Sequence, residues 1–238
     1  MTLTLIINAD DFGYESEVTR GIVQALEAGV VSSTTMMVNT PNSAAAGALA
    51  RSKSWPIGLH FNLSRFAPLS TQVGPGDFNE ARAVEQPSTH LAAELRAQLD
   101  RLEALVGRPA THIDVHRHLH THAKVFEAIV AVALERSLPV RSVDERMRRL
   151  LKAAGVRTND VFVGDAGTEA YWTPAQLSTD LAALPATGIV ELMCHPGYAP
   201  KAFSSGYGAQ REVELATFCS PRSKAMLAAT GLTPRGWA

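Results

Sequence analysis

The sequence predicts an α/β protein, an irregular (β/α) barrel of the TIM-barrel type with about seven parallel strands. Short apolar runs rich in β-branched residues alternate with segments of helical periodicity almost from end to end. In addition, each polar cluster able to carry chemistry falls at the C-terminal end of one of these predicted strands. A doubly wound open sheet shows the same alternation and is the alternative. The length, 238 residues of which 46% are hydrophobic, suits one domain over residues 1–238.

The first half of the chain alternates apolar strands with amphipathic helices. Val18, Ile22 and Leu26 recur at helical spacing after the first strand. Asn42 and Ser88 are of residue types that cap helices, and we expect each to cap the helix it opens. The expected strands are Leu3–Ala9, Val30–Val38 and Ile57–Leu63, and the expected helices are Glu17–Ala28, Asn42–Arg51 and Ser88–Val106.

Residues Ser64–Pro87 are rich in glycine, proline and polar side chains and show no clear period. A loop of this length inside a compact domain is more often functional than idle. We therefore expect a flap or rim over a site.

The second half continues the same pattern. Thr173 and Pro174 have the residue types that open a helix, with Gln176 at the capping-box position. The expected strands are His112–His116, Pro139–Val143, Val161–Val163 and Gly188–Cys194, and the expected helices lie at Lys124–Arg136, Glu145–Ala154, after Pro174 and at Arg222–Ala229.

Composition excludes several classes of function. The formal net charge is −1 and no long basic run occurs, so nucleic acid and anionic membranes are not expected partners. No apolar stretch approaches the ~20 residues that span a bilayer, and the N-terminus lacks the basic start of a signal peptide. Two cysteines are too few for a disulfide framework. We expect a cytoplasmic protein.

The first chemical cluster is Asp10-Asp11 at the end of the first strand. Two adjacent carboxylates repel each other unless a cation or a proton intervenes. Because neighbours on a strand point to opposite sides, one could bind a metal while the other orients a group or abstracts a proton. A simple turn that caps the next helix is an equally good interpretation of this pair alone.

The second cluster pairs His60 with Asn62 on one face of a strand. A lone histidine in a strand is more often a hydrogen-bonded core residue than a ligand, so this pair is weak evidence alone.

The third cluster is the strongest, because a strand would project His112, Asp114, His116 and His118 to one side. Imidazole is the commonest metal ligand, and Asp114 could fix a histidine tautomer from behind. The alternative is a solvated histidine-rich edge, but the apolar residues between the histidines argue for burial. A buried row of histidines without a metal or charged partner would be expensive.

The fourth cluster ends the last strand at His195, followed by a Pro-Gly turn and Tyr198. His195 is either a catalytic imidazole or a capping histidine. Taken together, one carboxylate and two imidazoles with an open position form the ligand set of a catalytic metal centre. A spare carboxylate and a spare histidine would then supply a base and an acid.

The motifs NADDFG, GLHFNL, THIDVHRHLH and ELMCHPGY, in this order, resemble the YdjC-like carbohydrate deacetylases. That family includes chitooligosaccharide deacetylases and deacetylases associated with hopanoid biosynthesis. The resemblance runs from Ile6 to about Tyr198, and Arg211–Leu215 resembles a late family segment more weakly. It implies an irregular (β/α) barrel that removes an acetyl group from an N-acetylated sugar or oligosaccharide.

Carried over to this sequence, the resemblance implies one divalent metal ion held by Asp11, His60 and His116. It also implies Asp10 as general base and His195 as general acid. We assign the remaining polar residues of the motifs to substrate binding: Asn62, Asp114, His118, Tyr198 and Arg211. Ligand softness suits zinc, cobalt or manganese, whereas members of the family have been described with magnesium.

Two departures from the family bear on the substrate. Arg117 stands where chitooligosaccharide enzymes tend to have another histidine, and the Ser64–Pro87 segment is short beside theirs, so a chitobiose-type substrate does not follow. The rival functions are a metal-dependent hydrolase of another amide or a phosphoester, and a non-catalytic sugar-binding barrel. A homodimer is the default assembly.

Overall fold

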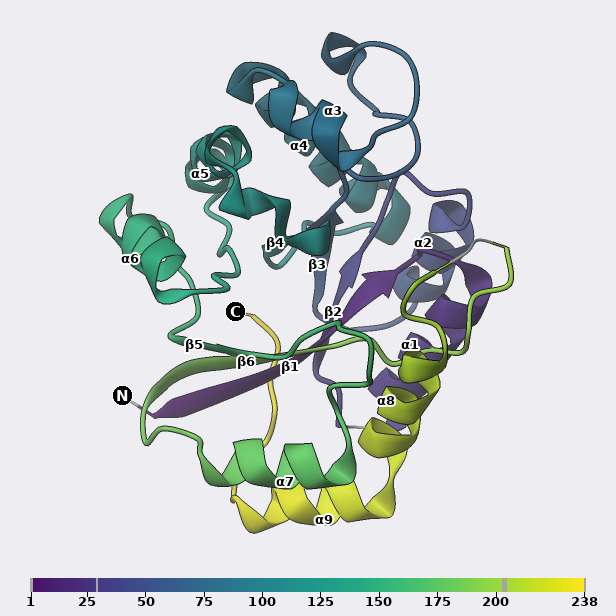
Figure 1. Ribbon diagram of the computed structural model, residues 1–238, viewed down its shortest axis with the longest axis vertical. Helices are drawn as coiled ribbons and strands as arrows, with labels where there is room; N and C mark the ends of the chain where they lie inside the picture. Colours follow the sequence, from purple (N-terminus) through teal and green to yellow (C-terminus); the bar gives the residue numbers. More distant parts are fainter. Residues whose placement is uncertain (1, 29, 203–204, 238) are drawn as a thin grey trace.

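The computed structural model describes residues 2–28, 30–202 and 205–237 (Figure 1). Its strands form one curled parallel sheet in the order β4-β3-β2-β1-β6-β5. The predicted class, an irregular (β/α) barrel, is confirmed, but the sheet has six strands and not seven. The strands are β1 (Leu3–Phe12), β2 (Ser33–Met36), β3 (Ile57–Phe61), β4 (Ile113–Val115), β5 (Val161–Val163) and β6 (Gly188–Cys194).

The missing strand is the one expected at Pro139–Val143. This segment makes a single bridge to the sheet, between Val140 and Ile113. On its other side, the side chain of Asn159 replaces a strand ladder: its Oδ1 accepts the Ser142 N–H at 2.7 Å, and its Nδ2 donates to the Ser142 carbonyl at 2.8 Å. Hydrogen bonds of the Asn159 side chain therefore replace part of the backbone ladder that a seventh strand would have made between β4 and β5.

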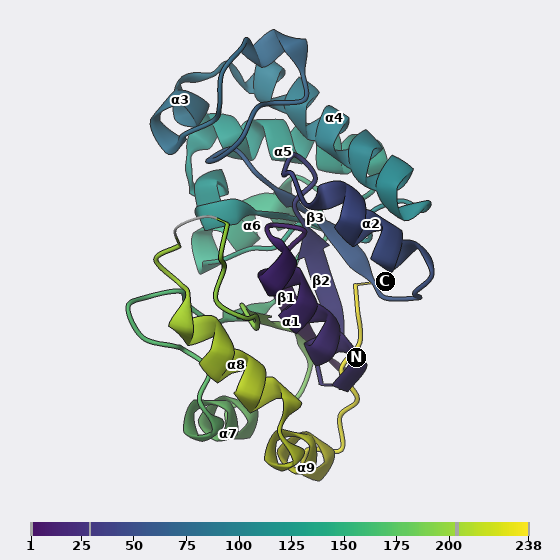
Figure 2. The same cartoon turned by 90° about the vertical axis from the view of Figure 1, so that its right-hand side faces the viewer.

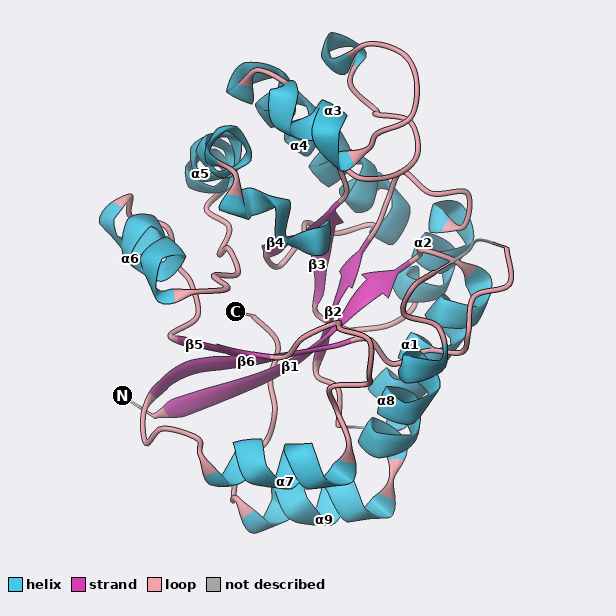
Figure 3. Cartoon of the chain, in the orientation of Figure 1, coloured by secondary structure: helices cyan, strands magenta, loops and turns pink. Residues whose placement is uncertain are grey.

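The helices lie around the outside of the curled sheet (Figures 1 and 3). Two helices, Glu80–Glu85 and Ala209–Cys219, fall in regions for which no helix was predicted. The helices are α1 (Ser16–Ala28), α2 (Ser43–Arg51), α3 (Glu80–Glu85), α4 (Ser88–Val106), α5 (Ala123–Arg136), α6 (Glu145–Ala153), α7 (Pro174–Ala182), α8 (Ala209–Cys219) and α9 (Pro221–Ala229), with 3₁₀ turns η1 (Thr71–Val73) and η2 (His116–Thr121).

Two predicted helix caps are wrong. Asn42 precedes α2, but its amide donates to the Thr19 hydroxyl at 2.9 Å and makes no cap. Pro87 holds the position before α4, so Ser88 is already inside the helix. Thr173 does cap α7, because its hydroxyl accepts the Gln176 N–H.

The two faces of the sheet have opposite character. Leu5 and Ile7 of β1 pack into the hydrophobic core with Val18 and Ile22 of α1. The other face holds buried polar side chains. They include Asn8, Asp10, His60, Asp114 and Glu191. Polar groups this deeply buried need partners, so the inner face is where a site should be sought. Among the described residues, no helix is long and apolar enough to cross a membrane.

Candidate metal centre

A bulge in β1 turns two neighbouring aspartates toward the same place. Ala9 lies opposite Thr34 and Phe12 opposite Met36, so β1 carries one extra residue at this point. Asp11 occupies the left-handed region with φ of +73°. Both carboxylates approach His60, so the expectation that they point to opposite sides is wrong. A bulge re-aims side chains in this way, and such backbone is typical of functional sites.

Asp11, His60 and His116 converge as the sequence predicts. Asp11 Oδ1 lies 3.2 Å from His60 Nε2 and 3.2 Å from His116 Nδ1, and the two nitrogens are 3.1 Å apart. Ligands held at ~2.0–2.2 Å from one cation are separated by roughly 3–3.5 Å. Asp11 Oδ1 is buried without a hydrogen-bond donor among the described residues. The three atoms therefore fit a divalent cation, with further positions open.

Asp114 stands behind His60. It is paired with His60 in the β3–β4 register, and its Oδ1 lies 2.6 Å from His60 Nδ1. A carboxylate in this position fixes the tautomer that presents Nε2 to a cation. Burial lowers the pKa of His60, but Asp114 and Asp11 more than offset this and raise it to about 10. A bound cation would therefore displace a proton from His60.

The expected row of histidines along one strand is broken. β4 ends at Val115, and the chain turns into η2, where Arg117 and His118 have φ values of +57° and +54°. The turn carries His116 back toward His60, with ring centroids 5.2 Å apart. The ligand geometry thus depends on an irregular turn and not on strand alternation.

Arg141 lies at the centre of the buried charges beneath this group. Its guanidinium contacts Asp10 at 2.6 and 2.7 Å, Asp114 at 2.8 Å and Glu191 at 2.7 Å, and it is fully buried. Burial would raise the pKa of Asp10, but Arg141 holds it well below its usual range. Burial raises the pKa of Glu191 to about 7.

Counting charges supports a cation at this place. The cluster has more carboxylates than guanidinium groups, four against two, so two negative charges remain when all six are ionised and His60 has given up its proton, as cation binding requires. The carboxylates are Asp10, Asp11, Asp114 and Glu191, and the guanidinium groups are Arg141 and Arg211.

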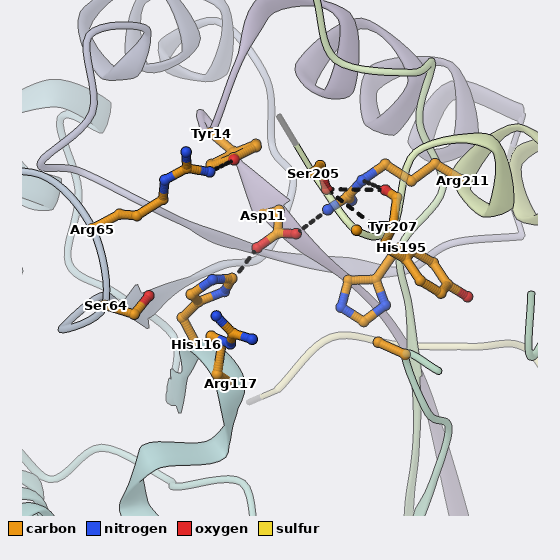
Figure 4. A pocket seen from close by; sticks show the side chains of 12 residues that line it. Asp11, Tyr14, Ser64, Arg65, His116, Arg117, His195, Ser205, Tyr207 and Arg211 are labelled. Carbon is orange, nitrogen blue, oxygen red and sulfur yellow. Dashed lines mark hydrogen bonds and ion pairs between the residues drawn. The ribbon is translucent and has the colours of Figure 1, made fainter. Parts of the chain in front are cut away.

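A cavity of about 540 Å³ opens above Asp11 and His116. That volume is within the range of small-molecule sites. Figure 4 shows Asp11 between Arg211 and His116. His195 lies next to Tyr207, on the same side as Arg211. The lining consists of Asp11, Tyr14, Ser64, Arg65, His116, Arg117, Ala166, His195, Ser205, Gly206, Tyr207 and Arg211.

His195 is placed at the end of β6, and its ring borders the cavity. Its Nδ1 has no hydrogen-bond partner among the described residues, and its ring packs edge-on against Tyr207. Burial lowers the pKa of His195 to about 4, so the free imidazole is neutral at pH 7. A neutral imidazole beside the cavity is able to take up and return a proton.

The other predicted site residues lie outside the cavity lining. Asp10 and Asp114 are buried beneath the metal group. Asn62 is buried at the root of the Ser64–Pro87 segment, where its amide bonds the Arg65 carbonyl at 2.9 Å.

Tyr198 and His118 also lie away from the lining. The Tyr198 hydroxyl donates to Gln24, and the guanidinium of Arg20 covers its ring. His118 packs edge-on against Phe162. Of the five residues assigned to substrate binding, Arg211 alone lines this cavity.

Arg141 and Glu214 were missed as functional residues in the sequence. Arg141 had a signal, because a charged residue within an apolar segment needs a buried partner. Glu191, inside the apolar β6, is such a residue. Glu214 had one weak signal, the resemblance of Arg211–Leu215 to a late family segment, and it lies in a helix that was not predicted.

Comparisons with known proteins match nearly the whole chain. The family model of the YdjC-like proteins matches residues 4–229. Chitooligosaccharide deacetylase of Serratia marcescens is 34% identical over 247 residues, covering 97% of this chain and 96% of that protein. The protein of the same name from Yersinia pestis is 34% identical over 245 residues, with 97% and 96% covered.

Solved structures share the fold. A protein of Enterococcus faecalis V583, described as a candidate for cellobiose-phosphate cleavage, has a TM-score of 0.87 and 26% identity, covering 100% of this chain and 98% of that one. The catalytic domain of a peptidoglycan N-acetylglucosamine deacetylase from Eubacterium rectale has a TM-score of 0.52 and 10% identity, covering 100% and 89%, and shows the fold alone. With nearly its whole length matched, the chain belongs to the YdjC-like family.

Proposed function

We propose that the protein is a metal-dependent deacetylase that removes the acetyl group from an N-acetylated sugar or oligosaccharide. The observation that carries the proposal is the convergence of Asp11, His60 and His116 at ligand distances beneath an open cavity. The relatives named chitooligosaccharide deacetylase support the reaction and the substrate class.

A divalent cation held by these three residues would polarise the acetamide carbonyl and lower the pKa of water. Two imidazoles and one carboxylate suit zinc, cobalt or manganese, whereas magnesium, which prefers oxygen ligands, is the less natural partner of imidazole. The buried carboxylate excess in the cluster supports a divalent rather than a monovalent cation.

The protein groups would divide the proton transfers. Asp10, kept ionised and oriented by Arg141, accepts the proton of the attacking water. His195, neutral at the cavity wall, takes up a proton from solvent and passes it to the departing amine, while Asp10 returns the water proton to solvent, so that acetate and a free amino sugar leave. Each of these contributions is typically worth ~10²–10⁴-fold in rate.

The test combines product analysis with one substitution. Acetate should appear in equal amounts with free amine from at least one member of a panel of N-acetylated sugars. Asp10→Asn should lose activity while its metal content stays that of the wild type. An Asp10→Asn protein with near-full turnover would remove Asp10 from the mechanism, and absence of acetate from any sugar would refute the deacetylase.

A phosphoester hydrolase is the second candidate. Arg65, Arg117 and Arg211 line the cavity, and such side chains suit a phosphate group. Against it, the two candidate cation groups share His60, and Arg141 already pairs with the carboxylates of the inner one. Release of phosphate without acetate from a phosphorylated N-acetyl sugar would favour this candidate.

A further inference from the structure

Helix α8 reaches the candidate site with two side chains from one of its faces. Arg211 Nη2 lies 2.5 Å from Asp11 Oδ2, and Glu214 Oε2 accepts the backbone N–H of His195 at 2.6 Å. Residues three apart on a helix are neighbours on its surface. Both side chains are buried. The helix α8 therefore contacts both Asp11, a candidate metal ligand, and His195, the candidate proton donor.

Tyr207 joins these two contacts. Its hydroxyl donates to Glu214 Oε1 at 2.5 Å, and its carbonyl oxygen accepts from Arg211 Nε at 2.9 Å. Its ring packs edge-on against His195, with centroids 5.3 Å apart, and it lines the cavity. Glu214 therefore fixes both the backbone of His195 and the aromatic ring that His195 rests on.

The turn after His195 is held separately, between α8 and α1, which lie side by side (Figure 2). The N–H of Gly197 donates to the Arg211 carbonyl at 3.1 Å. A Cβ on Gly21 of α1 would lie 2.4 Å from Gly197 Cα, so only glycine allows this approach. These contacts do not involve the Glu214 side chain, so replacing it leaves the turn anchored.

We propose that Glu214 is a positioning residue for His195 and Arg211 a positioning residue for Asp11, so that α8 sets the placement of the proton donor relative to the metal ligands. The inference rests on the proposed deacetylase function. Arg211 occupies Asp11 Oδ2 and leaves Oδ1 to face His60 and His116. Glu214 supplies the acceptor without which the buried His195 N–H would be unpaired.

Variants of Glu214 separate geometry from charge. In Glu214→Gln the amide oxygen can accept from His195 and the amide nitrogen can donate to the Tyr207 hydroxyl oxygen. We expect Gln to keep kcat within about threefold, and Glu214→Ala to lower it by ~10–100-fold with a smaller change in KM. Should the alanine variant not fold, Glu214→Asp replaces it, because it withdraws the carboxylate by one methylene.

Thr217→Val is the matched control. Thr217 is buried one turn further along α8, and its hydroxyl donates to the Trp172 carbonyl at 3.0 Å, away from the cavity. This variant should lose stability and keep its kcat. An equal loss of kcat in Thr217→Val and Glu214→Ala would reduce Glu214 to a structural residue.

A double-mutant cycle tests whether Glu214 acts through His195. If it does, Glu214→Ala should change the residual kcat of a His195→Ala protein by less than about threefold. A loss as large as in the wild-type background would overturn the proposal.

Two readouts do not depend on activity. Arg211→Ala should weaken zinc binding by at least ~10-fold in a calorimetric titration, and Glu214→Ala should leave it unchanged. The imidazole NMR signal of His195, assigned by its loss in His195→Ala, should shift in Glu214→Ala and stay in place in Glu214→Gln and Thr217→Val. If the wild type releases no acetate, the deacetylase proposal fails, yet these readouts still decide the positioning roles. An unmoved signal in Glu214→Ala would contradict the role of Glu214, and unchanged zinc affinity in Arg211→Ala would contradict that of Arg211.

Discussion

The guanidinium of Arg141 donates hydrogen bonds to both carboxylate oxygens of Asp10, at 2.6 and 2.7 Å, although the two residues are 131 positions apart in the chain. The pair is completely buried under the candidate metal group. A bidentate pair of this kind fixes the plane of the carboxylate and keeps it ionised. The orientation of Asp10 on β1 therefore depends on the segment Pro139–Val143, which is bridged to β4 at one edge of the sheet.

Replacing Arg141 with methionine should destabilise the protein strongly. Removing one partner of a buried ion pair typically costs ~3–5 kcal/mol, and here three carboxylates would lose their cation. Arg149→Met is the control, because Arg149 is largely exposed and pairs only with Glu145 among the described residues; it should change stability by less than about 0.5 kcal/mol. Urea unfolding of both variants measures the difference, and equal stabilities would contradict the buried-cluster account.

Replacing His116 with alanine should abolish metal binding. The substitution removes one of three ligands, and the His116 side chain is partly exposed, so the apo fold should survive. In the wild type, metal at ~100 times its Kd should stabilise the fold by about 2.7 kcal/mol, seen as a rise in Tm. His122→Ala, at an exposed histidine of the same segment, should keep that rise. A metal-dependent rise in Tm that persists in His116→Ala would show that the metal lies elsewhere.

Metal affinity should increase with pH. The pKa of His60, raised to about 10 by Asp114 and Asp11 despite burial, means that the apo protein carries a proton that a cation must displace. With one proton released, Kd should fall about tenfold for each pH unit between 6 and 8. Titration calorimetry in two buffers of different ionisation enthalpy counts the proton. Binding without proton release would refute a protonated His60.

The ligand residues could be predicted from the sequence because each lies at or near the C-terminal end of a predicted strand, and the carboxyl ends of parallel strands meet at one edge of a sheet. Asp11, His60 and His116 are brought together in this way. Their final geometry could not be predicted. It depends on the β1 bulge and on two left-handed residues after β4, Arg117 among them, and alternation carries no information on either.

The partners of the supporting residues could not be predicted from the sequence, for a different reason. Arg141 meets Asp10 and Glu191 only across the curled sheet, and its segment makes a single bridge where a full strand was predicted. The Asn159 side chain bonds the backbone of Ser142 in place of a strand neighbour, and strand propensities do not predict such side-chain bonds. Helix α8 follows a glycine-rich stretch, and its buried polar face, Arg211 and Glu214, masks the apolar periodicity that indicates a helix.

Glu214 should make the stability of the fold fall as pH rises. Burial raises the pKa of Glu214 from 4.5 to about 7, so between these values the folded protein keeps a proton that the unfolded chain has released. Stability is then lost as pH increases through this window, by on the order of 3 kcal/mol. Glu214→Gln should lack this loss and gain stability relative to the wild type from pH 4 to pH 7.5. Thr217→Val, which adds no titratable group, should follow the wild-type profile, and a Glu214→Gln profile parallel to the wild type would contradict the raised pKa.

The most direct test of the central claim is acetate release by metal-stripped protein, measured on N-acetylated sugars before and after adding zinc, cobalt, manganese or magnesium. The account predicts no acetate without metal, acetate with at least one of the four, and none at any metal concentration from His116→Ala. Acetate release that is independent of metal, or that persists in His116→Ala, would contradict a reaction centred on Asp11, His60 and His116.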